Sequence, residues 1–283
     1  MKIGAVYPQI ELGGNPDAVR RFALAAEALG YDHLLAYDHV VGATHDREPK
    51  LWGPYTERDP FHDPLIMFAY LAGLTHKLEF ATGVIILPQR QTALVAKQVA
   101  DLDLLSGERL RFGIGVGWNY VEYQALGQDF ATRGARADEQ MALMRRYWTE
   151  DLVSFKGRFD EVDRGNILPR PRRQVPIWVG GFQEPAFRRG GQLGDGFIFA
   201  GDQPLAHLAR VKHHLQEAGR TLGGYGLDFI TNVSRSVDDV AKAADLWRAA
   251  GGTHLSVCTM SMGFKSVEAH IDFIAQVKVR LAG

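Results

Sequence analysis

Residues 78–88 read Leu-Glu-Phe-Ala-Thr-Gly-Val-Ile-Ile-Leu-Pro, an apolar and β-branched run interrupted by one glycine. This pattern predicts a buried strand with a bend at Gly83. Apolar runs predict two further strands, one ending at Asp38-His39 and one within Arg111–Trp118. Each run ends in polar or small residues and is followed by a helical pattern. In a parallel barrel such strand ends share one face, and barrel enzymes carry their chemistry on that face.

The alternation of strand and helix continues along the whole chain. Asn15-Pro16 and Asp63-Pro64 each combine a capping side chain with a proline in the first helical turn, so each predicts a helix start. Strands that alternate with helices imply right-handed crossovers and a parallel sheet. Eight such units in 283 residues favour a closed (β/α)8 TIM barrel over an open doubly wound sheet. The predicted strands are Ile3–Tyr7, His33–Tyr37, Leu78–Leu87, Leu110–Val116, Ile177–Val179, Phe197–Ala200, Leu227–Val233 and His254–Cys258.

We expect a single domain over residues 1–283, because no linker divides the chain. Two insertions interrupt the regular alternation, near residues 41–61 and 150–175. Within the second, Val153–Val162 alternates around Lys156-Gly157, which predicts a β-hairpin outside the barrel.

Composition narrows the class of protein. The chain is 46% hydrophobic and 23% charged, as is usual for a globular protein with a large core, and its net charge of −1 gives no basic footprint for nucleic acid or a membrane surface. Cys258 is the only cysteine, which excludes a disulfide framework and a thiolate metal cluster. Pro8 interrupts the first apolar run too early for a signal-peptide core. We therefore expect a soluble, cytoplasmic protein with a small-molecule partner.

The glycine pattern Gly113-Ile-Gly115-Val-Gly117 does not fit a dinucleotide fingerprint, because Trp118 occupies the position that requires the third glycine. The three glycines share one face of the predicted strand. Two interpretations stay open: the face accommodates a flat ligand, or it packs tightly against a neighbouring strand. For Gly83 the two interpretations are room for a planar ring against the strand and a kink at a corner of the barrel.

Asp38-His39 at a strand end could perform acid–base chemistry, because histidine titrates near neutral pH. The alternative is a capping aspartate beside a solvent-facing histidine. A metal site would also recruit His62 and Asp63, but no ligand spacing supports it, and we predict no metal.

Gly180-Gly181 follows a predicted strand and leads into a helix that contains Arg188-Arg189. Free backbone N–H groups and the helix dipole make such a turn suitable for an anion, with the Asp195–Gly201 turn beside it. The arginines fit a solvated helix face equally well. The chain has no G-x-S-x-G elbow and no Walker loop, which leaves a bound organic cofactor or simple acid–base chemistry.

Several segments resemble a known family, the bacterial luciferase-like oxidoreductases. The resemblance runs from the first strand to about Gly201 and is most specific over Leu78–Trp148. Within the family, the chain is most similar to the short branch that is expected to use the deazaflavin coenzyme F420. The matching segments are Leu87–Arg109, Gly113–Trp118, Val121–Gly127, Arg133–Arg136, Pro176–Gly181 and Leu193–Gly196.

The resemblance implies a luciferase-like (β/α)8 barrel with insertions, and a dimer. It implies that His39 is the catalytic residue near the reactive edge of the cofactor ring, with Asp38 beside it. Gly83-Val84 matches a non-proline cis peptide that backs the ring, and Trp118 matches a residue on the substrate side. Trp52, in the 41–61 loop, is expected to line the same pocket. The positions that match the surroundings of the cofactor phosphate are Gly180, Gly181, Ala200 and Gly201.

Some positions depart from the better-known deazaflavin enzymes of the family. Those enzymes have glutamate at Trp118 and threonine at Ala200, and a phosphate-binding lysine near Gln203. FMN-dependent members usually have a Gln-Ala-Gly-Ser-like phosphate turn, which Gly180-Gly181-Phe182-Gln183 does not resemble. The resemblance therefore favours F420 over FMN and leaves the substrate open.

The resulting hypothesis is an oxidoreductase that transfers a hydride between reduced F420 and a small organic substrate. Three alternatives remain: an FMN-dependent luciferase-like monooxygenase, a metal-dependent barrel hydrolase or isomerase built on Asp38, His39, His62 and Asp63, and a cofactor-binding protein without catalysis.

Overall fold

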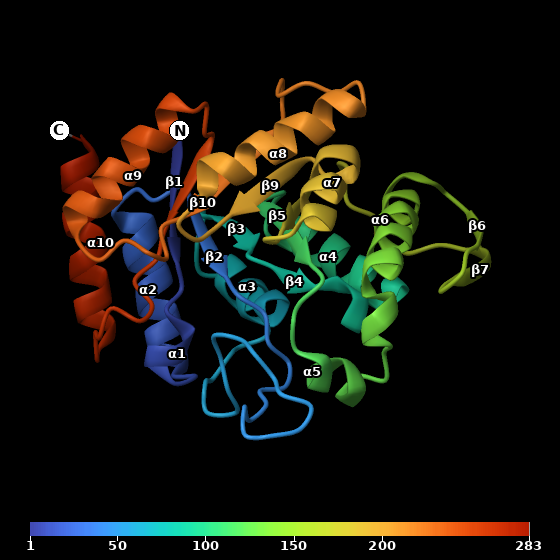
Figure 1. Ribbon diagram of the computed structural model, residues 1–283, viewed down its shortest axis with the longest axis horizontal. Helices are drawn as coiled ribbons and strands as arrows, with labels where there is room; N and C mark the ends of the chain where they lie inside the picture. Colours follow the sequence, from blue (N-terminus) through green and yellow to red (C-terminus); the bar gives the residue numbers. More distant parts are fainter. Residues whose placement is uncertain (283) are drawn as a thin grey trace.

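Parallel strands close into a barrel because β3 pairs with β5 as well as with β2 (Figure 1). The computed structural model describes residues 1–282. Nine strand segments form the sheet, in the order β3-β2-β1-β11-β10-β9-β8-β5-β4. Since β3 and β4 are two pieces of one barrel position, eight positions result, as the sequence predicts. The segments are β1 Lys2–Val6, β2 His33–Ala36, β3 Glu79–Thr82, β4 Ile85–Ile86, β5 Leu110–Gly115, β8 Ile177–Gly180, β9 Gly196–Phe199, β10 Gly226–Ile230 and β11 His254–Val257.

One long helix follows each barrel position and covers the outside of the sheet. Two predicted helix starts are confirmed: Asn15 Oδ1 accepts from the Asp17 and Ala18 amides, and Asp63 caps α3 in the same way. Within residues 1–282, no helix has the length and apolarity needed to cross a membrane. The covering helices are α2 Pro16–Ala28, α3 Pro64–Ala72, α4 Thr92–Leu105, α6 Arg133–Thr149, α7 Glu184–Leu193, α8 Pro204–Glu217, α9 Val237–Ala249 and α10 Val267–Ala282.

The remaining elements lie outside this repeat. The predicted hairpin is confirmed as β6 Val153–Lys156 paired antiparallel with β7 Glu161–Gly165, far from the barrel axis in Figure 1. Short helices α1 Gln9–Leu12 and α5 Tyr120–Ala125 lie with the loop between β2 and α3 at one end of the barrel, the lower end in Figure 1. This is the carboxyl end of the strands, and we call it the barrel mouth.

Two predicted strands differ from the structure. The expected strand Leu78–Leu87 is split into β3 and β4, and the break falls at Gly83–Val84. The expected strand Leu227–Val233 ends at Ile230, since the chain turns there and the Ser234 amide bonds to the Thr231 carbonyl. The β-branched residues after Ile230 suggested a longer strand than the turn allows.

The glycine face of β5 packs against the neighbouring strand pair, which decides between the two interpretations left open by the sequence. A Cβ added to Gly113 would overlap the carbonyl oxygen of Thr82. One on Gly115 would lie 2.5 Å from Val84 Cγ2, and one on Gly117 would lie 2.9 Å from Ile86 Cγ2. The glycines therefore let β5 approach the segment around the β3–β4 break.

A buried polar cluster fills the opposite, amino-terminal half of the barrel. Arg111 Nη2 donates to Asp228 at 3.0 Å, and the guanidinium lies 4.4 Å from the centre of the Trp178 ring. His33 Nε2 lies 2.8 Å from Ser256 Oγ, which in turn donates to Asp228. Burial alone would raise the pKa of Asp228, but Arg111 and His33 outweigh it and hold that pKa below its usual range. We call this cluster the base plug.

Gly113→Ala should destabilise the fold by about 3 kcal/mol, because the added methyl group meets backbone that cannot rotate away. Urea unfolding of the purified variant measures this loss. Gly73→Ala is the matched control: its nearest neighbour would be 3.7 Å away, and we expect a change within about 0.5 kcal/mol. Equal unfolding midpoints for the two variants would contradict the packing argument.

Candidate active site

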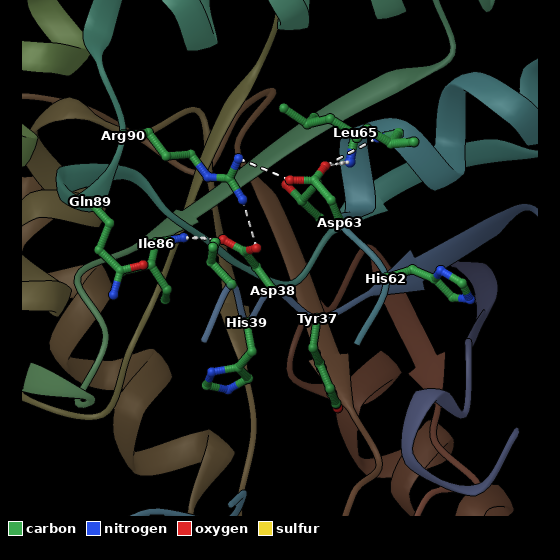
Figure 2. A network of polar contacts seen from close by, with 12 residues as sticks. Tyr37, Asp38, His39, His62, Asp63, Leu65, Ile86, Gln89 and Arg90 are labelled. Carbon is green, nitrogen blue, oxygen red and sulfur yellow. Dashed lines mark hydrogen bonds and ion pairs between the residues drawn. The ribbon is translucent and has the colours of Figure 1, made fainter. Parts of the chain in front are cut away.

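Asp38 follows β2 at the barrel mouth, and its carboxylate forms hydrogen bonds with β4 and with the segment before α4 (Figure 2). Its Oδ2 accepts from the Ile86 amide at 3.0 Å, and its Oδ1 accepts from Arg90 Nη2 at 2.7 Å. Arg90 Nη1 donates to Asp63 Oδ2 at 3.0 Å. Burial raises the pKa of Asp38, while Arg90 and the Ile86 amide oppose that rise. Both oxygens of this predicted cofactor-binding carboxylate therefore face protein donors.

The four residues of the metal-dependent alternative do not form a common ligand set. The Arg90 guanidinium binds the carboxylates of Asp38 and Asp63, and a cation there would repel it. Figure 2 shows His62 and His39 pointing in different directions, away from those carboxylates. Elsewhere in the described part of the chain, three potential ligands cluster at His213, His214 and Glu217 on α8. Both ring nitrogens of His214 are already engaged there, by Glu217 and Glu184.

The predicted catalytic residue, His39, lies in an aromatic enclosure. Its ring centre is 5.2 Å from that of Tyr55, 4.8 Å from that of Phe61 and 5.6 Å from that of Trp118. Its side chain is 11% exposed, so the imidazole is largely shielded from water. Nδ1 lies 3.7 Å from Glu122 Oε1. The enclosure therefore leaves only a small part of the His39 imidazole, a group that can exchange a proton, open to solvent.

The two tryptophans expected to line the substrate pocket lie in different places. Trp118 contacts His39 and packs so tightly on Gly53 that a Cβ there would overlap its ring. Trp52 is 72% exposed, and Lys50 Nζ lies 4.2 Å from the centre of its ring. The structure therefore brings Trp118, but not Trp52, to His39. The loop contributes Tyr55 and Phe61 to the enclosure instead.

The expected non-proline cis peptide is present between Gly83 and Val84. A Cβ on Gly83 would overlap Leu35, which belongs to the apolar interior of the barrel. The Val84 side chain lies between two glycines: added Cβ atoms would be 2.5 Å from it on Gly115 and 2.8 Å on Gly180. Val84 therefore forms a raised apolar surface over β5 and β8.

The predicted phosphate-binding residues come together through the pairing of β8 with β9, in which Gly180 lies opposite Ile198. The Gly201 amide donates to Asn232 Oδ1 at 2.9 Å. The residues preceding α7 and α8, Gln183 and Gln203, make no side-chain cap. The glycine turns thus lead into two helix N-termini without a side-chain cap. Pro185 and Pro204 carry no N–H, and the Ala186 and Phe187 amides donate to the Gln183 carbonyl, so only the remaining N–H groups are available to an anion.

The Arg188-Arg189 pair divides into two roles. Arg189 is buried; its Nε donates to Asp138 at 2.5 Å and its Nη2 to the Gly134 carbonyl at 2.9 Å. Arg189 therefore fastens α7 to α6 and is not directed at the glycine turn. Arg188 is exposed, as the solvated-face interpretation expects.

Glu122, a carboxylate that is only 1% exposed, belongs to the site but is not among the residues predicted from the sequence. Its Oε1 accepts from the amides of Val40 and Val41, at 2.5 and 2.9 Å, and its Oε2 accepts from Gln89 Nε2 at 2.8 Å. Burial alone would raise the pKa of Glu122, but His39, the Val41 amide and Gln89 hold it below its ordinary value. Asn119-Tyr-Val-Glu122 has capping-box spacing, which suggests only a local role.

The chain belongs to the luciferase-like monooxygenase family, whose model matches residues 4–270. A relative from Mycobacterium tuberculosis, an uncharacterized protein, is 33% identical over 231 residues, which cover 79% of this chain and 80% of that protein. An F420-dependent glucose-6-phosphate dehydrogenase of Amycolatopsis mediterranei is 29% identical over 202 residues, which cover 70% of this chain and 57% of that protein.

Two solved structures share the fold over nearly the whole chain. One is an F420-dependent secondary alcohol dehydrogenase in complex with an F420-acetone adduct, with a TM-score of 0.80, 16% identity and coverage of 99% of this chain and 98% of that chain. The other is the FMN-bound oxygenating constituent of 3,6-diketocamphane monooxygenase of Pseudomonas putida, with a TM-score of 0.77, 17% identity and coverage of 100% and 98%. Proteins with this fold thus use either F420 or FMN.

Arg90→Met should destabilise the fold by about 3–5 kcal/mol at neutral pH, because Asp38 is then left buried without its cation. Arg90 opposes the raised pKa of Asp38, so its removal raises that pKa further. A carboxyl whose pKa is raised by folding destabilises the fold at pH values above its pKa in the unfolded chain, and this cost declines as the pH falls toward that value. The loss should therefore shrink as the pH falls toward about 5.

Urea unfolding at the two pH values measures this effect. Arg58→Met is the control, because Arg58 is 88% exposed and pairs only with its neighbour Glu57. We expect that control to change stability by less than about 0.5 kcal/mol at either pH. A loss for Arg90→Met that is independent of pH would count against the buried pair.

Proposed function

We propose that this protein is an oxidoreductase that transfers a hydride between a reduced deazaflavin, coenzyme F420, and a small organic substrate. The observation that carries the proposal is the shielded imidazole of His39 at the barrel mouth of a luciferase-like chain. The F420-dependent relatives named above and the departure of the Gly180–Gln183 turn from the FMN pattern support the choice of cofactor.

The residues at the mouth fit a cofactor with a flat ring and a phosphate. Val84, raised over Gly115 and Gly180, offers an apolar surface for one face of a ring. The Gly180-Gly181 turn and the starts of α7 and α8, which have no side-chain cap, would offer backbone N–H groups to the phosphate, whereas the Gly201 amide is already bonded to Asn232. When bound, the deazaflavin supplies the hydride chemistry.

The protein's own residues would position the reactants and handle the proton. His39 would hold a proton at its imidazole and pass it to the substrate, and Trp118 would line the substrate side. Tyr55, Phe61 and Trp118 keep water from the imidazole, which strengthens electrostatic interactions there. Asp38 would act on the cofactor site by holding the chain after Val84 in place rather than by touching the ring.

The alternative function is an FMN-dependent monooxygenase. It is favoured by the family's description and by the FMN-bound structure that shares the fold. Both functions would use the barrel mouth, so the identity of the bound cofactor, F420 or FMN, distinguishes one function from the other. A homodimer is also proposed; sedimentation equilibrium would test it, and a monomer at micromolar concentration would refute it.

Titration with oxidised F420 should quench the fluorescence of the five tryptophans saturably and at lower concentration than FMN does. Trp118 lies at the mouth, so ligand binding there should reach it directly. Tighter binding of FMN would instead support the monooxygenase. Binding of neither would refute both.

His39→Ala should lower turnover by about 100-fold or more, because it removes the proton donor while the phosphate turns stay intact. The affinity for F420 should change little. His213→Ala, on the exposed face of α8, is the control and should keep full turnover. Unchanged turnover in His39→Ala would remove His39 from the mechanism.

A further inference from the structure

Glu122 reaches from α5 to the loop that carries His39. Its carboxylate binds two consecutive amides, of Val40 and Val41, and the side chain of Gln89. Asn119, which caps the same helix, donates from Nδ2 to the Val41 carbonyl at 3.0 Å. Residues 39–41 are thus held against α5 on both the donor and the acceptor side of the backbone.

Among the described residues, His39 is the one cationic partner of Glu122. Arg90, the nearby guanidinium, is directed at Asp38 and Asp63. A carboxylate this deeply buried needs donors or a positive charge to remain ionised. The imidazole at 3.7 Å supplies such a charge when it is protonated.

The orientation of His39 follows from the groups around it. Nδ1 faces Glu122, and the rings of Tyr55, Phe61 and Trp118 surround the imidazole. Burial raises the pKa of Tyr55 above its ordinary value, so its phenol is uncharged at neutral pH. Asp38 is the other acidic neighbour, and its oxygens are engaged by Arg90 and the Ile86 amide. Glu122 is therefore the anion that faces this imidazole.

We propose that Glu122 is a positioning residue: its carboxylate holds the Val40 and Val41 amides and faces Nδ1 of His39 at 3.7 Å, which favours the tautomer with its proton on Nδ1 and leaves Nε2 to serve the substrate at the mouth. The proposal rests on the proposed function for the role of Nε2. Glu122 thus acts through His39, whereas Asp38, which precedes His39 in the sequence, holds the segment on the cofactor side of the mouth.

Glu122→Gln removes the negative charge of the side chain and keeps its shape. The amide oxygen can still accept from Val40 and Val41. Gln89 Oε1 is buried and has no partner, so a rotated Gln89 amide can accept from the new N–H group. The contacts are kept and the negative charge is lost. Glu122→Ala, by contrast, removes both.

The matched control is Glu139→Gln. The carboxylate of Glu139 also accepts from consecutive amides, those of Arg158, Phe159 and Asp160, at 2.7–2.8 Å. It lies beside the β6–β7 hairpin and faces no histidine. Glu139→Gln therefore removes the charge of a carboxylate that binds backbone amides but has no contact with His39.

The test is nitrogen-15 NMR of histidine-labelled full-length protein, with His39→Ala to assign the signal. In the wild type, the neutral imidazole should carry its proton on Nδ1. In Glu122→Gln, which carries no negative charge opposite Nδ1, this preference for Nδ1 should be lost. Glu139→Gln should leave it unchanged. A neutral ring protonated on Nε2 in the wild type, or the same tautomer in wild type and Glu122→Gln, would overturn the proposal.

Steady-state kinetics gives an independent measurement. In Glu122→Gln, kcat should fall about tenfold with KM for the cofactor little changed, because the imidazole is no longer held in one tautomer. A loss of turnover accompanied by an equal rise in KM, or the same loss in Glu139→Gln, would mark Glu122 as merely structural and overturn the proposal. A changed tautomer in a protein that turns over no substrate would uphold the role of Glu122 and count against the proposed function.

Discussion

An ionised carboxylate inside a protein must be surrounded by donors, and at the barrel mouth the pair formed by Asp38 and Arg90 satisfies this constraint. Asp38 and Asp63 stand at the two ends of the long loop between β2 and α3, and the Arg90 guanidinium joins them. This one side chain therefore closes the base of the loop. The aromatic rings that the loop places around His39, and the segment after Val84 that Asp38 holds, both depend on the same contact.

Two carboxylates near His39 illustrate how environment sets function. Asp38 is matched to a permanent cation, Arg90, and its geometry is used to hold the backbone. Glu122 is matched to the backbone amides of Val40 and Val41 and to the side chain of Gln89, and it faces the His39 imidazole. A cation thus holds the first carboxylate, and neutral donors hold the second.

The barrel could be predicted from the sequence because its signals are local. Asn15 and Asp63 cap helices that begin at the next residue. Gly83 interrupts a β-forming run at the point where β3 and β4 separate. The site was predictable only in part. Arg90 and Glu122 bind partners that lie many residues away in the sequence. The capping-box spacing of Asn119 and Glu122 suggested that Glu122 only caps its own helix. The exposure of Trp52 depends on how its loop folds, and the glycine face of β5 fits either a ligand or a strand until the neighbouring strand is seen.

The base plug has a consequence for how ligands could enter the barrel. Among the described residues, Arg111, Trp178, Asp228 and His33 pack together inside its amino-terminal half. Under the proposed function, cofactor and substrate would therefore both enter and leave at the mouth. The ligand that binds deeper would then have to bind first and leave last, which predicts an ordered kinetic mechanism.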